Sequence, residues 1–283
     1  MPEAIEGSLT FLGTGTSMGV PSLGCSCAVC TSTDPRDKRL RPSILLRWPA
    51  STPSGLDFRN IVIDTGPDFR TQALSQNLHR VDAVFYTHSH ADHILGMDDL
   101  RPLSFAMHKE SGPIPLFVTR ETRAVLERIY EYTFSPHSKY PNRARVILQD
   151  VHEGAVIDNL RVTPIPVLHG TLPITGYRFG NTAYLTDVST IPEPSFALLE
   201  GLETLIVSAL RHVPHPSHAT VEQAVAWAER IGAKNTWFTH ISHDLGHEST
   251  NAILPAGISL AWDGLTIPFK APFTAAPVEA AQS

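Results

Sequence analysis

The segment that most constrains this chain is THSHADH, residues 87–93, which directly follows the apolar run VDAVFY. His88 and His90 lie two positions apart on extended chain, so their side chains point the same way. Asp92 and His93 follow the bend and face a neighbouring point. Imidazole and carboxylate ligands at this density suit Zn²⁺, Mn²⁺ or Fe²⁺. We therefore predict two adjacent metal sites at the end of a buried strand.

Composition excludes several functions. The 283 residues are 42% hydrophobic, enough for a full core. The 22 Lys and Arg against 28 Asp and Glu leave a formal charge of -6, so we expect no nucleic-acid partner held by a general positive field. No apolar stretch approaches the roughly 20 residues of a membrane span, and the first residues do not resemble a signal peptide. We expect a cytoplasmic protein without a membrane partner.

Apolar patterns predict strands over residues 8–13, 43–48, 60–64, 81–86, 114–119, 159–169, 174–179, 181–187, 204–210 and 235–240. Helical patterns cover residues 69–77, 120–134, 195–200 and 220–233, and a short helix follows the histidine motif. These two βαβ-like halves predict an α/β fold with two sheets face to face and helices outside. We predict one domain over residues 1–270 and a disordered tail over 271–283, which is rich in Ala and Pro.

All three cysteines, Cys25, Cys27 and Cys30, lie in the segment CSCAVC. An odd number in one tight cluster is not a disulfide framework, whereas the spacing suits thiolates that converge on one soft metal ion. Three thiolates need a fourth ligand, which the spacing does not identify. The alternative is a loop of free or buried thiols.

The motif THSHADH resembles that of the metallo-β-lactamase fold, an αββα sandwich of two mixed sheets with outer helices and a dinuclear metal site at one edge. VIDTG, VLHG, YLTDVS and FTHISH resemble further motifs of that family, and the resemblance runs from about residue 9 to residue 269. It implies one metal held by His88, His90 and His169, a second held by Asp92, His93 and His240, a bridging Asp187, and Asp64 orienting a ligand histidine.

Three further segments, GTGTSMGVPSLGCSCAVC, DPRDKRLRPS and HDLGH, are similar to the branch with the phosphoribosyl 1,2-cyclic phosphate phosphodiesterases. That resemblance implies a structural zinc on Cys25, Cys27, Cys30 and His243. It also implies hydrolysis of a small cyclic phosphodiester by a hydroxide shared between two ions, with Asp92 and Asp187 in the catalytic site. Manganese or zinc at that site, and a homodimer, stay open.

A leaving alkoxide needs a proton, so we expect an imidazolium beside the metals. Three histidines of RHVPHPSH are candidates: His212, His215 and His218. His218 precedes the helix ATVEQAVAW, which resembles the position of the catalytic histidine in the cyclic phosphodiesterases and in ribonuclease Z. We favour His218, although VSALRH lacks the aspartate that the related branch has before this loop.

Other functions stay open. A ribonuclease Z-like nuclease that processes RNA 3′ ends would share the metal ligands, but this chain has the cysteines and no long RNA-binding arm. A non-catalytic accessory protein of pyrroloquinoline quinone synthesis also carries such cysteines, but this chain retains every metal ligand. Hydrolysis of β-lactams or thioesters has no support in the sequence. Arg36, Arg39 and Arg41 could clamp a phosphate, although an arginine run is more often a solvated face.

Overall fold

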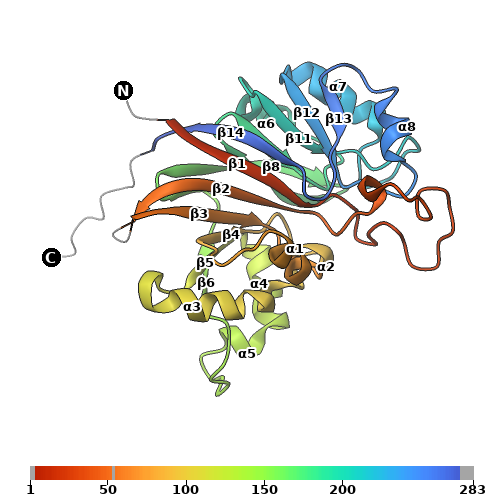
Figure 1. Ribbon diagram of the computed structural model, residues 1–283. Helices are drawn as coiled ribbons and strands as arrows, with labels where there is room; N and C mark the ends of the chain where they lie inside the picture. Colours follow the sequence, from red (N-terminus) through yellow and green to blue (C-terminus); the bar gives the residue numbers. More distant parts are fainter. Residues whose placement is uncertain (1–3, 53–54, 275–283) are drawn as a thin grey trace.

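The computed structural model describes residues 4–52 and 55–274. Two mixed seven-stranded sheets face each other, with helices outside, as Figure 1 shows. The first sheet has the order β14 (Thr266–Pro272), β1 (Ala4–Gly13), β2 (Ser43–Thr52), β3 (Gly55–Ile63), β4 (Ala83–Phe85), β5 (Ile114–Val118), β6 (Val146–Asp150). The second has the order β13 (Ile258–Leu260), β12 (Asn235–Thr239), β11 (Thr204–Ser208), β10 (Thr182–Leu185), β9 (Leu172–Phe179), β8 (Leu160–His169), β7 (Ala155–Ile157). The predicted αββα sandwich is confirmed.

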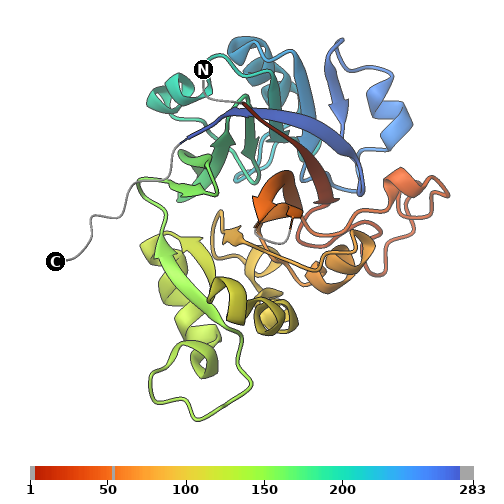
Figure 2. The same ribbon diagram turned by 60° about the vertical axis from the view of Figure 1, so that its left-hand side comes forward.

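The helices cover the outer faces, as the turned view in Figure 2 also shows. Beside the first sheet lie α1 (Phe69–Ser75), α2 (Ala91–Ile94), α3 (Arg101–Ser111), α4 (Arg120–Ile129) and α5 (Glu131–Phe134). Beside the second lie α6 (Glu193–Phe196), α7 (Val221–Ile231) and α8 (His247–Asn251). Three short 3₁₀ turns complete the set: η1 (Pro35–Asp37), η2 (Met97–Leu100) and η3 (Ala197–Leu199).

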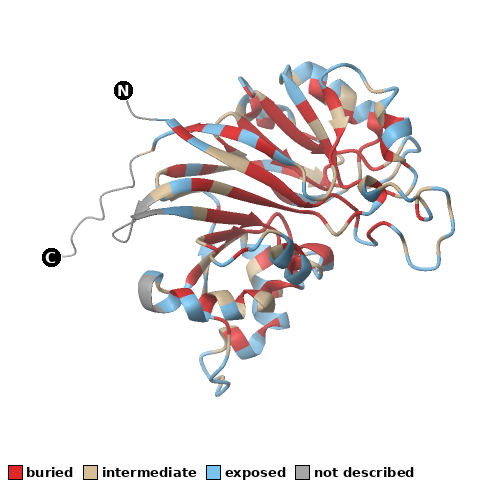
Figure 3. Cartoon of the chain, viewed as in Figure 1, coloured by how far each residue is buried: buried red, intermediate tan, exposed pale blue. Residues whose placement is uncertain are grey.

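The strands alternate between two cores because successive side chains point to opposite faces of a sheet. In β3, Ile61 and Ile63 pack between the sheets, whereas Val62 packs outward against the helices. In β11, Ile206 faces the inner core, whereas Leu205 and Val207 face α7. Figure 3 shows the buried residues concentrated along both sheets. Apolar runs without polar alternation therefore belong to strands covered on both sides.

The helix α7 illustrates why the predicted helices form. Thr220 and Gln223 make a reciprocal capping box at its start, and Gly232 ends it in the left-handed conformation at φ 71°. Ala224 and Ala228 are buried one turn apart against the second sheet. Its capping residues place the preceding loop, residues 211–218, at the ligand-bearing edge of the sheet.

Strands β6, β7, β13 and β14 were not predicted; β14 was discernible, because its side chains alternate strictly between exposed and buried. That strand continues to Pro272, since Ala4 and Ile5 pair with Pro272 and Ala271. The single domain over residues 1–270 stays a prediction. The remainder of the predicted disordered tail, residues 275–283, lies outside the described residues. Within the described part of the chain, no helix is long and apolar enough to cross a membrane.

Candidate metal centre

Strand ends from both sheets meet at one edge of the sandwich. In the first sheet, β3 and β4 run parallel, and Asp64 and the THSHADH segment follow them. In the second, β10, β11 and β12 run parallel, and β8 runs in the same direction through two antiparallel pairings. His169 ends β8, Asp187 follows β10 and His240 follows β12. The topology therefore delivers residues far apart in sequence to one place.

The polar side chains at this edge form groups of the predicted composition. His88, His90 and His169 make one group whose ligand atoms lie within 4.8 Å of one another. A second group, equally close, contains Asp92, His93, Asp187 and His240, all buried. Asp187 also lies within 4.8 Å of His169 and His218. Every active-site ligand predicted from the sequence thus lies in one of two neighbouring groups.

A buried hydrogen-bond chain orients the histidines that follow β4. His93 Nδ1 donates to Asp64 Oδ2 at 2.7 Å, and Thr87 donates to Asp64 through both its amide and its hydroxyl, each at 2.8 Å. His88 Nδ1 donates to the Thr87 hydroxyl at 3.0 Å. The proton on Nδ1 leaves each Nε2 as a lone-pair donor facing the site. Asp64 lies where it was predicted, but Thr87 was missed, although its place between strand and motif is visible in the sequence.

His169 is oriented by a main-chain group. Its Nδ1 donates to the carbonyl oxygen of Ser217 at 2.7 Å. That carbonyl belongs to the loop that carries His218, and Gly170, at φ 62°, lets the loop approach, since a Cβ there would lie 3.3 Å from Ser217 Cβ. Sequence analysis missed this contact because every residue carries the same backbone carbonyl. Only the fold determines which carbonyl lies beside His169.

Three acidic or basic residues of the site have left-handed backbones. Asp64, Asp187 and His240 have φ values of 64°, 56° and 54°. This conformation costs roughly 1–2 kcal/mol for a residue with a Cβ. Each follows the end of a strand, where the turn re-aims the side chain into the site. The surrounding sheets must hold these turns, so their conformation is a consequence of tertiary structure.

Two histidines flank the carboxylate of Asp187. Its Oδ1 lies 3.0 Å from His240 Nε2 and its Oδ2 lies 3.1 Å from His93 Nε2. Burial opposes the charge of Asp187, but His240 and His93 outweigh it and hold the pKa of this carboxyl well below its usual range. Burial opposes the protonation of His240 as well, but the negative charge of Asp187 favours it and outweighs burial. The pKa of His240 therefore rises to about 9.

The site passes a chemical test for metal binding. The buried Nε2 atom of His88 has no hydrogen-bond partner in the described chain, and Nε2 of His93 and of His240 faces the Asp187 carboxylate. Such atoms are costly to bury unless something else satisfies them. Imidazole nitrogen and carboxylate oxygen are the donors that zinc and manganese accept. The residues present therefore fit divalent cations.

The structure separates the three histidines of the loop before α7. His218 stacks on His240 with ring centroids 4.8 Å apart, and its Nδ1 lies 3.8 Å from Asp187 Oδ1. Burial, followed by the neighbouring His240, lowers the pKa of His218 to about 3. His215 lies one ring further out, 4.9 Å from His218. His212 is exposed and bonds to Glu222 at 2.6 Å, and its ring is in contact with none of the other site histidines that the structure describes.

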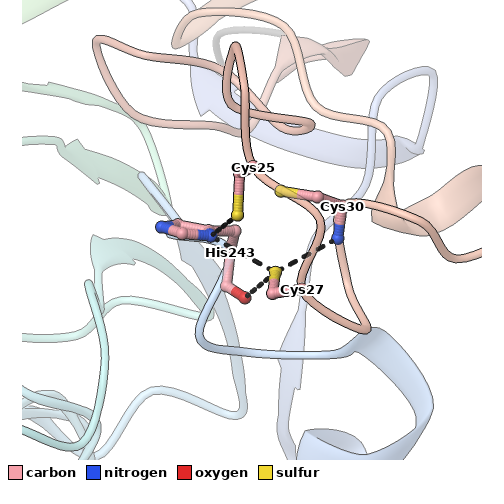
Figure 4. A group of neighbouring side chains, drawn as sticks. All are labelled: Cys25, Cys27, Cys30 and His243. Carbon is pink, nitrogen blue, oxygen red and sulfur yellow. Dashed lines mark hydrogen bonds between the residues drawn. The ribbon is translucent and has the colours of Figure 1, made fainter.

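The three cysteines converge on one point with His243, as Figure 4 shows. His243 Nδ1 lies 3.3 Å from Cys25 Sγ and 3.4 Å from Cys27 Sγ, and the Cys30 amide donates to Cys27 Sγ at 3.4 Å. That amide and the His243 ring lower the pKa of the Cys27 thiol to about 6. Three sulfurs and one imidazole nitrogen make a complete tetrahedral donor set for zinc.

The arginines of DPRDKRLRPS, which could clamp a phosphate but are more often a solvated face, pair with groups of the protein itself. Arg36 pairs with Asp34 and Glu248, and Arg41 pairs with Asp68 at 3.2 Å. Arg39 is 2% exposed and donates through Nη1 to the Thr14 hydroxyl and the Ala261 carbonyl. Arg39 is buried within the protein, whereas the side chains of Arg36 and Arg41 are 36% and 32% exposed and pair with neighbouring carboxylates at the surface.

A model of the beta-lactamase superfamily domain matches residues 59–241, which include both His/Asp groups. A solved structure described as a new diphosphatase from the PhnP family is 47% identical, with a TM-score of 0.86, over 96% of this chain and 100% of that one. This chain belongs to the beta-lactamase superfamily and its PhnP family. It is a metal-dependent hydrolase, as predicted.

Curated relatives carry other names. An octanoyltransferase of Porphyromonas gingivalis is 37% identical over 259 residues, 90% of this chain and 50% of that protein. A ribonuclease Z of Methanococcus maripaludis is 28% identical over 175 residues, 60% of this chain and 48% of that protein. The chain spans about half the length of these curated relatives.

Proposed function

We propose that this member of the PhnP family hydrolyses a small phosphodiester with two divalent metal ions. The observation that carries the proposal is the pair of adjacent donor groups linked by Asp187, which faces His93 with one oxygen and His240 with the other. The diphosphatase that matches this chain over its whole length supports a phosphoester substrate. The cyclic ester predicted from the sequence remains the narrower form of this proposal.

The residues would divide as the sequence implied: His88, His90 and His169 for one ion, Asp92, His93 and His240 for the other, and Asp187 between them. When bound, two such ions, manganese or zinc, lower the pKa of water and stabilise charge on a phosphoester. Asp64, Thr87 and the Ser217 carbonyl keep the ligand rings turned toward the centre. Preset orientation of this kind typically affects metal affinity by 10- to 100-fold.

His218 is the residue that we assign to leaving-group protonation. It lies against His240 and His169, with ring centroids 4.8 and 4.5 Å away, and it belongs to neither proposed ligand set. The negative charge of a bound phosphodiester favours the protonated ring. The proton can then pass from His218 to the departing oxygen.

The thiolate group would hold a structural zinc on Cys25, Cys27, Cys30 and His243. Its role is architectural, because all four donor positions come from the protein and none is left for substrate. His243 and His240 are three residues apart, and Ile241 between them donates its amide to the Thr14 carbonyl at 2.9 Å. A zinc here would therefore brace the segment that carries His240.

RNA processing is the second candidate, because curated ribonuclease Z proteins match 60% of this chain. Octanoyl transfer is the activity of a protein twice as long as the matched region, so we do not assign it to this chain. Small-molecule specificity, the absence of a nucleic-acid partner, a homodimer and a cytoplasmic location remain predictions from the sequence.

A substrate screen tests the proposal. The protein is reconstituted with manganese or zinc, its metal content is quantified, and it is assayed on ribose 1,2-cyclic phosphate, a 2′,3′-cyclic nucleotide, a nucleoside diphosphate ester, precursor tRNA, nitrocefin and an octanoyl thioester. We expect hydrolysis of small phosphoesters. Activity on precursor tRNA alone would favour the second candidate, and activity on the thioester alone would exclude both.

A further inference from the structure

We propose that Tyr177 is a positioning residue, whose hydroxyl holds the metal ligands of the first sheet at the correct distance from those of the second. This inference rests on the proposed function, since it concerns how the two active-site ions are held. Tyr177 belongs to neither ligand group and lies in the core between the sheets.

Each proposed metal site takes ligands from both sheets. In the first group, His88 and His90 follow β4 of the first sheet, whereas His169 ends β8 of the second. In the second group, His93 also follows β4, whereas His240 follows β12. The distance between the sheets at this edge therefore determines whether either group can close around an ion. Apolar packing has no preferred direction, so a directed hydrogen bond fixes that distance more exactly.

Two carbonyl groups just before the ligand histidines bond to the second sheet. The Tyr177 hydroxyl donates to the Tyr86 carbonyl at 2.6 Å. The Thr175 amide donates to the Thr87 carbonyl at 3.0 Å. Tyr86 meanwhile donates its own amide to the Phe117 carbonyl in the first sheet. The chain is thus bonded to both sheets directly before the first ligand histidine.

The place of Tyr177 in the second sheet gives this contact its effect. Its strand, β9, lies between β8, which ends at His169, and β10, which is followed by Asp187. Tyr177 is opposite Pro164 on β8 and opposite Tyr184 on β10. A hydroxyl carried by β9 therefore relates the segment after β4 to two ligand-bearing strands at once.

The hydroxyl of Tyr177 is suited to a fixed contact. The side chain is fully buried, and its ring packs edge to face on Phe85 with centroids 5.3 Å apart. Burial raises the pKa of Tyr177 well above its usual value, so the hydroxyl keeps its proton and can donate. Loss of the hydroxyl would leave the buried Tyr86 carbonyl without this donor. The segment that carries the ligands could then shift relative to the second sheet.

Tyr184 provides a matched control. It is equally buried, on the neighbouring strand β10 and in the same core. Its hydroxyl, however, has no hydrogen-bond partner in the described part of the chain. Tyr177→Phe and Tyr184→Phe therefore remove the same atom from the same core, and only the first removes a bond between the sheets.

Metal retention tests the role of Tyr177. The wild type and both variants are loaded with zinc or manganese and dialysed against buffers that set the free metal concentration, and the metal left on each chain is counted by elemental analysis. Tyr177→Phe should lose the two active-site ions at free metal concentrations about 10- to 100-fold higher than the wild type, the range for loss of a group that supports metal ligands from outside. Tyr184→Phe should match the wild type. All three proteins should lose the thiolate zinc at the same concentration.

Hydrogen exchange of residues 86–94 is a second measurement, which does not depend on metal affinity. Exchange should be faster in Tyr177→Phe than in Tyr184→Phe, and equal rates would contradict the positioning role. Equal metal retention by the two variants, or a lower Tm of Tyr177→Phe without loss of the ions, would overturn that role and leave the proposed function intact. A wild type that holds no ion beyond the thiolate zinc would instead count against the proposed function.

Discussion

At the residue scale, the site depends on side chains held in unfavourable backbone turns. Asp187 and His240 both have positive φ values and face each other at 3.0 Å. Local preference alone would not keep either residue in this conformation. The strands β10 and β12 end just before them, so the rigid second sheet absorbs the cost. The strands that precede these two residues, rather than their own backbone preferences, hold the side chains in the geometry of the site.

The assignment of His218 predicts a dependence on the leaving group. His218→Ala should reduce kcat about 10²- to 10⁴-fold on an ester that expels a basic alkoxide, because general acid catalysis is lost. A p-nitrophenyl ester expels a weakly basic phenolate and should lose far less. Both rates are measured on one metal-quantified preparation.

The metal content of His218→Ala should equal that of the wild type, since His218 is in neither proposed ligand set. His212→Ala serves as the matched control, and we expect it to retain activity on both esters. Equal losses of His218→Ala on the two esters would show that the ring positions substrate instead of protonating the leaving group.

At the element scale, two loops pack against strand ends that carry proposed metal ligands. The loop with the three cysteines packs on the segment that follows β12, through the contacts of Cys25 and Cys27 with His243. The loop before α7 packs on the end of β8 through His169. Both loops thus lie against a strand end that carries a proposed metal ligand. A substitution that moves either loop should therefore also shift a proposed metal ligand.

Removal of one thiolate tests the first of these loops. Cys27→Ala should lose one zinc per chain and lower Tm by more than about 5 °C, because a structural metal site contributes several kcal/mol to folding. Elemental analysis and thermal unfolding measure the two effects. Ser26→Ala, an exposed neighbour in the same loop, should change neither. Unchanged zinc content in Cys27→Ala would disprove the thiolate site.

At the scale of the whole molecule, a polar network ties the two ends of the chain together. Asp263 accepts from the Thr14 amide at 2.9 Å, from the Thr14 hydroxyl at 2.7 Å and from the Leu40 amide at 2.6 Å. Arg39 donates to the same Thr14 hydroxyl and to the Ala261 carbonyl. The network connects the loop after β1 with the loop before β14. Arg39 therefore stabilises the fold.

Arg39→Met should lower the free energy of unfolding by about 3 kcal/mol at pH 8, because it leaves Asp263 without a nearby cation in a buried network. Burial raises the pKa of Asp263 to about 6 in the folded protein. A raised folded pKa favours stability below the unfolded value and loses that contribution as pH rises through about 6. The deficit of the variant should therefore be smaller at pH 5 than at pH 8.

Denaturant titrations at the two pH values measure this difference, with Arg36→Met as the control for loss of an exposed positive charge. Arg36 pairs at the surface with Asp34 and with exposed Glu248, so its loss should lower the free energy of unfolding by far less than the loss of Arg39. A deficit for Arg39→Met that is independent of pH would show that Asp263 is not the group that depends on this charge.

The sequence by itself determined most of the fold and the identity of the site. Continuous apolar runs indicated most of the strands, because a strand between two layers is apolar on both faces. The spacing in THSHADH and CSCAVC indicated metal chemistry, because ligands that lie close in sequence must lie close in space. The edge strands β7 and β13 were missed because three residues carry too little pattern.

Only the tertiary structure decided which distant residues meet and which are hidden. The Ser217 carbonyl that orients His169 has no sequence signal, since every residue carries a carbonyl. Arg39 looked like a solvated or phosphate-binding arginine, yet it is buried against Thr14. The order of His212, His215 and His218 from solvent to metal centre depends on how one loop packs between β8 and α7. These outcomes arise from long-range packing, because the free energy that fixes them comes from contacts between segments far apart in the chain.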